Sequence, residues 1–226
     1  MSSSTAEAAG RVPVVVLLSG SGTNFAAIAA AAGSATLPIE VRAVLSDQPA
    51  APGLVRARAL GIPAEAVPAA GFADRARHDA ALADRIDVWR PALVVLAGYM
   101  RILSAEFVAR YADRMLNIHP SLLPEFRGLD THRRALAAGV TTHGCTVHFV
   151  NDELDGGPLV AQAPVPVLPG DSEGSLATRV RRAEHRLYPA VIGWYATGRL
   201  RATAGRVTLD GRPLTAPVRL ENLDAP

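Results

Sequence analysis

An amide, an imidazole and a carboxylate stand at the most chemically suggestive positions of this chain. Asn117 and His119 lie in the segment NIHPSLLP, and Asp155 lies in the segment DELDGG. Each group stands close to an apolar run, so we expect each one near the end of a strand. A reaction that builds negative charge on a carbonyl oxygen and also moves a proton can use all three groups.

The spacing of Asn117 and His119 places both side chains on one side of an extended segment. The two groups can then face one bound carbonyl, and an oxyanion donor typically contributes about 3–4 kcal/mol to lowering the barrier. A core histidine satisfied by the backbone is the alternative for His119. For Asp155 the alternative is a turn carboxylate that caps its own loop amides. In the functional interpretation Asp155 lies beside His119 and positions a water for proton transfer.

The turn from Ser19 to Asn24, with the sequence SGSGTN, joins an apolar run to an alanine-rich stretch. Glycines let the backbone bend tightly and bring amide groups towards a ligand, and a helix N-terminus favours an anion. The turn therefore predicts a phosphate site, with an ordinary tight turn as the alternative. The dinucleotide pattern G-x-G-x-x-G fails because residue 25 is Phe, which disfavours NAD.

The composition excludes several classes of function. All 23 basic residues are arginine, so lysine Schiff-base chemistry and a lysine-containing phosphate loop are ruled out. The net charge of +2 and the scattered arginines do not indicate a nucleic-acid groove. The histidines lack metal-ligand spacing, so we expect no metal. The single Cys145, in an apolar run, predicts a buried inert thiol, and no apolar run reaches membrane-spanning length, so we expect a cytoplasmic protein.

Strand and helix patterns alternate along the chain. We expect strands over residues 12–18, 41–45, 64–67, 92–97, 115–118, 146–150 and 159–167, and helices over 25–32, 53–60, 74–89, 131–138 and 171–197, with another helix capped by Ser104. Asp210-Gly211 predicts a C-terminal hairpin over 206–213.

This alternation predicts an α/β fold with a mostly parallel twisted sheet and helices on both faces. Sites in such sheets form outside the carboxyl ends of the strands. The ends at Leu18, Ala97, Ile118 and Val150 are therefore expected to converge on one crevice. We expect a flexible tail over residues 1–11 and a single domain over 12–226.

Five motifs appear in order: LLSGSGTN, LVVLAGYMRIL, LNIHPSLLP, HGCTVHFVNDELDGG and GDSE…EHRLYP. Over residues 12–213 they resemble the folate-dependent phosphoribosylglycinamide formyltransferase family. NIHPSLLP alone is shared with other enzymes that transfer or hydrolyse formyl groups on folate, whereas SGSGTN and AEHRLYP narrow the choice. The resemblance implies a Rossmann-like formyltransferase fold. It also implies that a formyl group passes from 10-formyltetrahydrofolate, as co-substrate, to the amine of glycinamide ribonucleotide in purine biosynthesis.

The resemblance also implies roles for individual residues. The catalytic group comprises Asn117, His119 and Asp155. The ribonucleotide, held by a phosphate-binding half over residues 12–110, is contacted by Gly22, Thr23, Asn24, Glu184 and Arg181. The catalytic and folate half spans 111–226, and the folate pocket is lined by Arg75, Met100, Arg101, Ile102, Leu103, Asn117, Asn151, Asp152, Glu153, Leu154 and Asp155. Family members often carry Ser where this chain has Thr23, and they vary at the position of Arg181.

Three other functions compete with this interpretation. Methionyl-tRNA formyltransferase shares the formyl site but is expected to need a further C-terminal RNA-binding domain. A formyltetrahydrofolate hydrolase is expected to need an N-terminal regulatory domain. A catalytically silent folate- or nucleotide-binding module is opposed by the retained Asn117, His119 and Asp155. The expected partners are small-molecule substrates, without nucleic acid or membrane, and homodimers occur among relatives.

Overall fold

The computed structural model describes residues 10–34 and 36–221; residues 1–9 of the expected tail lie outside them. The strands are β1 Val12–Leu18, β2 Ile39–Ser46, β3 Ala64–Ala66, β4 Leu93–Leu96, β5 Met115–His119, β6 Thr142–Phe149, β7 Leu159–Pro166, β8 Leu200–Thr203, β9 Arg206–Leu209, β10 Arg212–Pro213 and β11 Val218–Arg219. The helices are α1 Thr23–Gly33, α2 Pro52–Ala59, α3 Arg75–Asp87, α4 Ala105–Arg110, α5 Thr131–Ala137 and α6 Glu173–Ala196.

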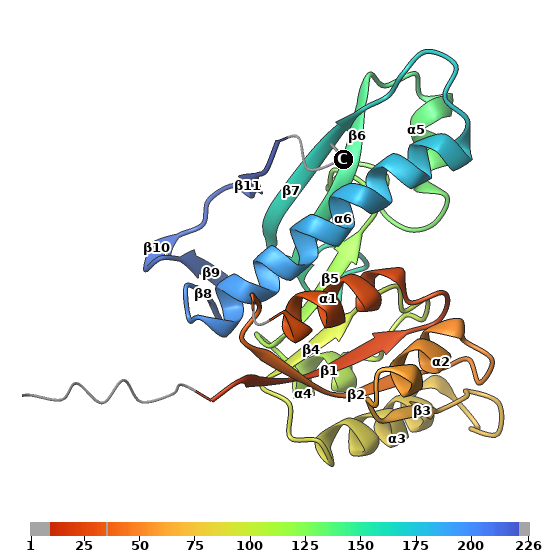
Figure 1. Ribbon diagram of the computed structural model, residues 1–226, viewed down its shortest axis with the longest axis vertical. Coiled ribbons are helices and arrows are strands. Elements are labelled where there is room, and N and C mark those ends of the chain that lie inside the picture. Colours follow the sequence, from red (N-terminus) through yellow and green to blue (C-terminus); the bar gives the residue numbers. More distant parts are fainter. Residues whose placement is uncertain (1–9, 35, 222–226) are drawn as a thin grey trace, which may run out of the picture.

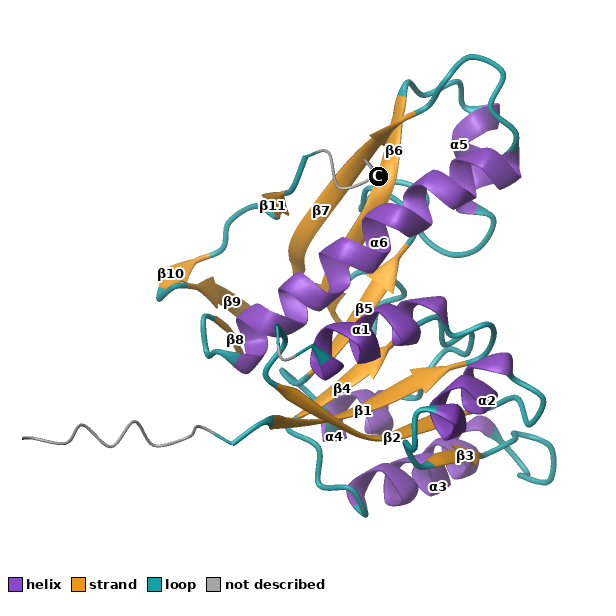
Figure 2. Cartoon of the chain, viewed as in Figure 1, coloured by secondary structure: helices purple, strands orange, loops and turns teal. Residues whose placement is uncertain are grey.

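An eight-stranded sheet in the order β11-β7-β6-β5-β4-β1-β2-β3 forms the centre of the molecule (Figure 1). Helices cover both of its faces (Figure 2), as the alternating pattern predicts. Val14 and Val16 of β1 pack into a core with α1 and α6, whereas Val15 and Leu17 pack into a second core with α3 and α4. Successive side chains of a strand point to opposite faces, so a continuous apolar run such as β1 is buried on both.

The parallel part of the sheet has a topological switch point. The chain runs from β1 to β2 and β3 on one side, and then returns to the other side of β1 as β4, followed by β5. In open α/β sheets, ligands bind outside the carboxyl ends of the strands at such a point. Here that crevice is bordered by the turn after Leu18 and by the segment after Leu96.

One sequence prediction is wrong because β6 runs antiparallel to both β5 and β7. The carboxyl end of β6 therefore lies beside the amino end of β5, where the Val150 amide donates to the Met115 carbonyl at 3.0 Å. Val150 does not join Leu18, Ala97 and Ile118 at one edge. Thr146 also lies inside β6 instead of beginning it, since residues 142–145 pair in register with β7.

The C-terminal hairpin is confirmed. Leu209 pairs with Arg212 across a two-residue turn, and Asp210 and Gly211 both have left-handed backbone angles, with φ of 52° and 76°. Such a pair of residues is the preferred connection between twisted antiparallel strands. β8 extends this hairpin to a three-stranded sheet, and β11 then returns to pair with β7. No helix within the described ranges is long and apolar enough to cross a membrane.

Candidate active site

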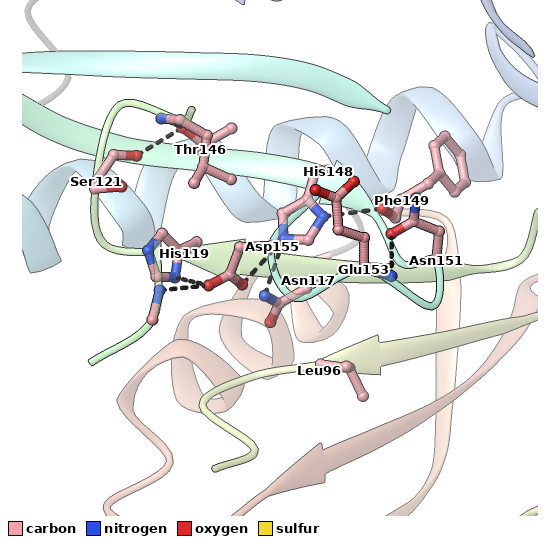
Figure 3. A network of polar contacts seen from close by, with 12 residues as sticks. Leu96, Asn117, His119, Ser121, Thr146, His148, Phe149, Asn151, Glu153 and Asp155 are labelled. Atoms are coloured by element: carbon pink, nitrogen blue, oxygen red, sulfur yellow. Dashed lines mark hydrogen bonds and ion pairs between the residues drawn. The ribbon is translucent and has the colours of Figure 1, made fainter. Parts of the chain in front are cut away.

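The amide of Asn117 is oriented by a histidine on the neighbouring strand. Asn117 of β5 lies opposite His148 of β6, and the Asn117 Nδ2 lies 3.1 Å from the His148 Nε2 (Figure 3). The His148 Nδ1 lies 2.9 Å from the Phe149 carbonyl and donates to it. Burial lowers the pKa of His148, so the ring is neutral and its Nε2 accepts from Asn117. One Asn117 amide hydrogen is used in this way, and the second remains for a ligand.

The Asp155 carboxylate lies between two histidines. Its Oδ2 is 3.4 Å from the His119 Nδ1, its Oδ1 is 3.8 Å from the His148 Nε2, and it accepts a hydrogen bond of 2.9 Å from the Gly128 amide (Figure 3). These partners come from other segments, which argues against a carboxylate that only caps its own loop. Asp155 is only 9% exposed, so its interaction with His119 is weakly screened by solvent.

The His119 ring is held from both sides. Its Nε2 donates to the Phe126 carbonyl at 3.0 Å, and its Nδ1 faces Asp155. Because both neighbours are acceptors, the imidazolium, which donates from both nitrogens, suits this environment. The backbone alternative therefore accounts for only one of the two ring nitrogens. Donation from Nε2 to a bound carbonyl requires the Phe126 hydrogen bond to be shared or exchanged.

Thr146 orders the turn that follows His119. Its hydroxyl donates to the Ser121 carbonyl at 2.6 Å and accepts from the Leu123 amide at 3.0 Å. The Gln162 side chain of β7 donates to the Leu123 carbonyl at 2.7 Å. Thr146 and Gln162 together therefore hold the backbone that follows His119.

A pocket opens beside Asn117 and Asp155. Apolar side chains of β4, α4 and the segments after β4 and β6 line it together with the polar side chains of β5, β6 and the loop after β6. The lining residues are Leu96, Tyr99, Arg101, Ile102, Leu103, Val108, Asn117, His148, Val150, Asn151, Asp152, Glu153, Leu154 and Asp155. Most of the residues expected for folate are thus brought together.

Two residues expected at this pocket are not among its lining residues. Met100 is 65% exposed, and Arg75 lies at the exposed start of α3. Tyr99, which the sequence interpretation overlooked, lines the pocket, and its buried hydroxyl finds no hydrogen-bond partner among the described residues. Its only sequence signal was its place between Gly98 and the expected folate segment.

The residues expected for the ribonucleotide gather where α1 begins. Gly22 has φ of 70° and precedes α1 without a side-chain cap, which leaves the first helical amides free for an anion. A Cβ at Gly22 would lie 2.7 Å from the Gly53 Cα, so this position requires glycine. The Asn24 Nδ2 donates to the Glu184 Oε2 of α6 at 2.9 Å, which joins the turn to the long helix.

Glu184 is a buried acid within this cluster. Burial raises the pKa of Glu184, while the hydrogen bond from Asn24 and the charge of Arg181 act in the opposite direction. Arg181 is exposed and lies one turn earlier on α6. The structure thus brings a helix N-terminus, an amide, an acid and a cation into one region, which suits a ligand with a phosphate and hydroxyl groups.

His119 and Asp155 each have a contact with a segment that the sequence did not indicate as part of the site. The loop between β5 and α5 supplies the Phe126 carbonyl to His119 and the Gly128 amide to Asp155. Both are backbone groups, so their residue types gave no indication of the contact. The hydrogen bond of His148 to Asn117 likewise joins side chains on two different strands.

Known proteins resemble this chain in sequence and in fold. The family model described as formyl transferase matches residues 12–192. A phosphoribosylglycinamide formyltransferase of Escherichia coli is 51% identical over 201 residues, which is 89% of this chain and 95% of that protein. The phosphoribosylglycinamide formyltransferase structure from Coxiella burnetii superposes with a TM-score of 0.89 at 47% identity and covers 93% of this chain and 99% of that one.

A solved structure of lower identity carries a different name. The formyltetrahydrofolate deformylase structure from Burkholderia mallei superposes with a TM-score of 0.80 at 29% identity, and the match covers 89% of this chain but 70% of that one. Higher identity and nearly complete coverage in both directions therefore favour the formyltransferases. The chain belongs to the formyl transferase family and, within it, to the phosphoribosylglycinamide formyltransferases.

Proposed function

We propose that this enzyme transfers the formyl group of 10-formyltetrahydrofolate to the amine of N1-(5-phospho-D-ribosyl)glycinamide. The products are formylglycinamide ribonucleotide and tetrahydrofolate, as a cytoplasmic step of purine biosynthesis. The names of the relatives supply the acceptor. The observation that carries the proposal is the network of Asn117, His148, Asp155 and His119, three of which line one pocket with apolar side chains of β4 and α4.

The pocket suits a flat heterocycle with a reactive group at one end. Leu96, Val108 and Val150 supply apolar walls, and Arg101 has a buried Nε that lacks a hydrogen-bond partner among the described residues. A pteridine can bury its rings against those walls and offer acceptors to the unpaired donor. The formyl group would then lie towards Asn117 and Asp155.

Asn117 and His119 stabilise the oxygen of the formyl group. As the free amine attacks the formyl carbon, this oxygen gains negative charge. Asn117 donates its second amide hydrogen, and His148 keeps the amide turned the correct way. The imidazolium of His119 adds a positive charge, and Asp155 stabilises that imidazolium. Donors held in place before the reaction are effective because they need no reorganisation as charge develops.

Asp155 assists the transfer of a proton from the attacking amine to the leaving folate nitrogen. The attacking amine must lose a proton, and the leaving folate nitrogen must gain one. Asp155 lines the pocket, accepts a hydrogen bond from the Gly128 amide and faces His119, so it can accept a proton directly or through a water. No covalent enzyme intermediate is required, which agrees with the buried, inert Cys145, whose thiol pKa is raised by burial.

A spectrophotometric assay of tetrahydrofolate formation tests this proposal. Product is expected only when 10-formyltetrahydrofolate and glycinamide ribonucleotide are both present. Tetrahydrofolate release at an equal rate without the ribonucleotide would show a hydrolase of the kind represented by the deformylase. Binding of both ligands without turnover would show a silent binding module.

A further inference from the structure

The hydroxyl of Ser19 joins two segments that we assign to different substrates. Ser19 is the first residue after β1 and begins the turn expected to hold the phosphate. Its Oγ donates to the Asp47 Oδ1 at 2.5 Å and accepts from the Met100 amide at 2.8 Å. The Ser19 amide also donates to the Gly98 carbonyl at 2.9 Å. One residue therefore contacts both borders of the crevice at the switch point.

Asp47 fixes the direction of this hydroxyl. The carboxylate is 5% exposed and accepts a second hydrogen bond, of 2.7 Å, from the Gln48 side chain. Because an ionised carboxylate only accepts, it takes the Ser19 hydrogen and leaves the oxygen lone pairs for the Met100 amide. A buried acid directly after β2 thus sets the distance between the turn over residues 19–24 and the folate segment over residues 99–103.

We propose that Ser19 and Asp47 are positioning residues that couple the binding of the phosphorylated acceptor to the binding of the folate. This inference rests on the proposed function, because it needs the two ligands to occupy the two segments. Neither residue lines the folate pocket or belongs to the catalytic group. Their role is to hold the two segments in mutual register.

The physical basis of this coupling is that the two segments lose conformational freedom together. A phosphate bound at the start of α1 restricts the turn, and the Ser19 hydroxyl passes that restriction to the Met100 backbone. The folate then meets a segment that is already ordered and loses less conformational entropy on binding. Coupling is reciprocal, and couplings between protein sites typically change affinity by about 5- to 150-fold.

Calorimetric titration with tetrahydrofolate, with and without saturating glycinamide ribonucleotide, measures this coupling without turnover. We expect the ribonucleotide to tighten tetrahydrofolate binding by about 5-fold or more in the unmodified enzyme. Ser19→Ala and Asp47→Ala should each bring the ratio of the two dissociation constants to within about 2-fold of one. Asp47→Asn keeps an oxygen that accepts from Ser19, so the ratio of the two dissociation constants should stay close to that of the unmodified enzyme.

Asp79→Asn is the matched control at the far end of the folate segment. Asp79 accepts from the Ser104 amide at 2.6 Å and, within the described part of the chain, makes no hydrogen bond to residues 19–24. The variant should weaken tetrahydrofolate binding and keep the ratio, as a merely structural role predicts. Ser46→Ala, which removes only the acceptor for the Gln48 amide, controls for disturbance of the end of β2.

An unmodified enzyme with a ratio of one, or alanine variants that retain the full ratio, would overturn the coupling. If a separate assay of the same protein shows formyl transfer, the proposed function stands and only this inference fails. If the unmodified enzyme binds neither ligand and shows no transfer, both fail together.

Discussion

The turn after β1 and the loop after β6 contribute to the same site in different ways. The turn, residues 19–24, follows a parallel strand and offers backbone amides at the start of α1. The loop, residues 151–157, follows a reversed strand and returns to deliver one carboxylate, Asp155, to His119. The turn contributes through local backbone geometry, whereas the loop contributes through tertiary contacts of a side chain. Changes in the turn should therefore affect the binding of one substrate, whereas changes around Asp155 should affect the chemical step.

The largest effect is expected from Asp155→Asn. The amide cannot accept a proton and no longer stabilises the imidazolium of His119, so kcat should fall by about 10⁴-fold, the upper end of what a positioned acid–base group contributes. Steady-state rates of tetrahydrofolate formation measure the loss, and circular dichroism verifies the fold.

Asp152→Asn provides the matched control in the same loop. Asp152 is exposed and lines the pocket, but it has no contact with either histidine of the network. The kcat of Asp152→Asn should stay within about 10-fold of that of the unmodified enzyme. This loss is well below the loss expected when an acid–base group is removed. Equal losses in both variants would contradict the assignment of the proton step to Asp155.

A smaller loss is expected from Asn117→Ala. Removal of one oxyanion donor typically costs about 10²–10³-fold in kcat. The KM values should change little, because the lost interaction develops mainly in the transition state. Asn151→Ala removes another amide from the pocket lining, one that caps its own loop by accepting from the Glu153 amide. A loss for Asn151→Ala as large as that for Asn117→Ala would remove the special role of Asn117.

The same contrast explains how much the sequence revealed. The apolar run of β1, the glycines after it and the alanine-rich helix are neighbours in the chain, so the turn and its expected ligand followed from local patterns. Asn117 and His119 are two residues apart on one strand, so their shared side also followed. The position of β6 did not, because strand direction depends on which neighbour it pairs with. The parallel-sheet rule therefore placed Val150 at the wrong edge.

The loop between β5 and α5 marks the limit of sequence reasoning at this site. Phe126 and Gly128 take part through backbone atoms, and side-chain type carries no information about such contacts. The extension of β6 to Thr142 was missed for a related reason. Its first residues, Thr142, His143 and Gly144, have no strand-like pattern and are extended by pairing with β7.

A test of the turn is Gly22→Ala. The left-handed backbone there costs a non-glycine residue about 1–2 kcal/mol. The added Cβ would also lie 2.7 Å from the Gly53 Cα, so the turn must shift. We expect KM for the ribonucleotide to rise by about 10-fold, the equivalent of 1.4 kcal/mol, with little change in KM for the folate.

Gly20→Ala in the same turn is the control, since a Cβ there meets no atom within 4 Å. A rise in KM for the folate without a rise in KM for the ribonucleotide would contradict the assignment of this turn to the ribonucleotide.

The smallest effect on turnover at neutral pH is expected from His143→Phe. This variant tests which part of the molecule makes the unfolding free energy sensitive to acid. His143 lies in β6 beneath the loop of Phe126, with its ring 5.8 Å from that aromatic ring and 5.3 Å from His132. Burial lowers the pKa of His143 to about 4, and the charges of His132 and His119 act in the same direction. An unfolded histidine titrates near 6.5, so below that pH the unfolded chain binds more protons than the folded one. Stability is therefore lost as the pH falls from about 6.5 towards 4 and is unaffected by this group above 6.5.

Between pH 7.5 and pH 5, His143 should account for about 2 kcal/mol of the decrease in unfolding free energy. Urea denaturation at both pH values should show a decrease that is smaller by about this amount in His143→Phe. The half-buried His185 of α6, whose pKa burial also lowers, provides the control variant His185→Phe at a distance from the loop. An equal change in both variants would mean that acid sensitivity is spread over the fold. A larger change for His143 would show that the start of β6, where its ring packs against Phe126 and His132, carries more of this acid sensitivity than α6 does.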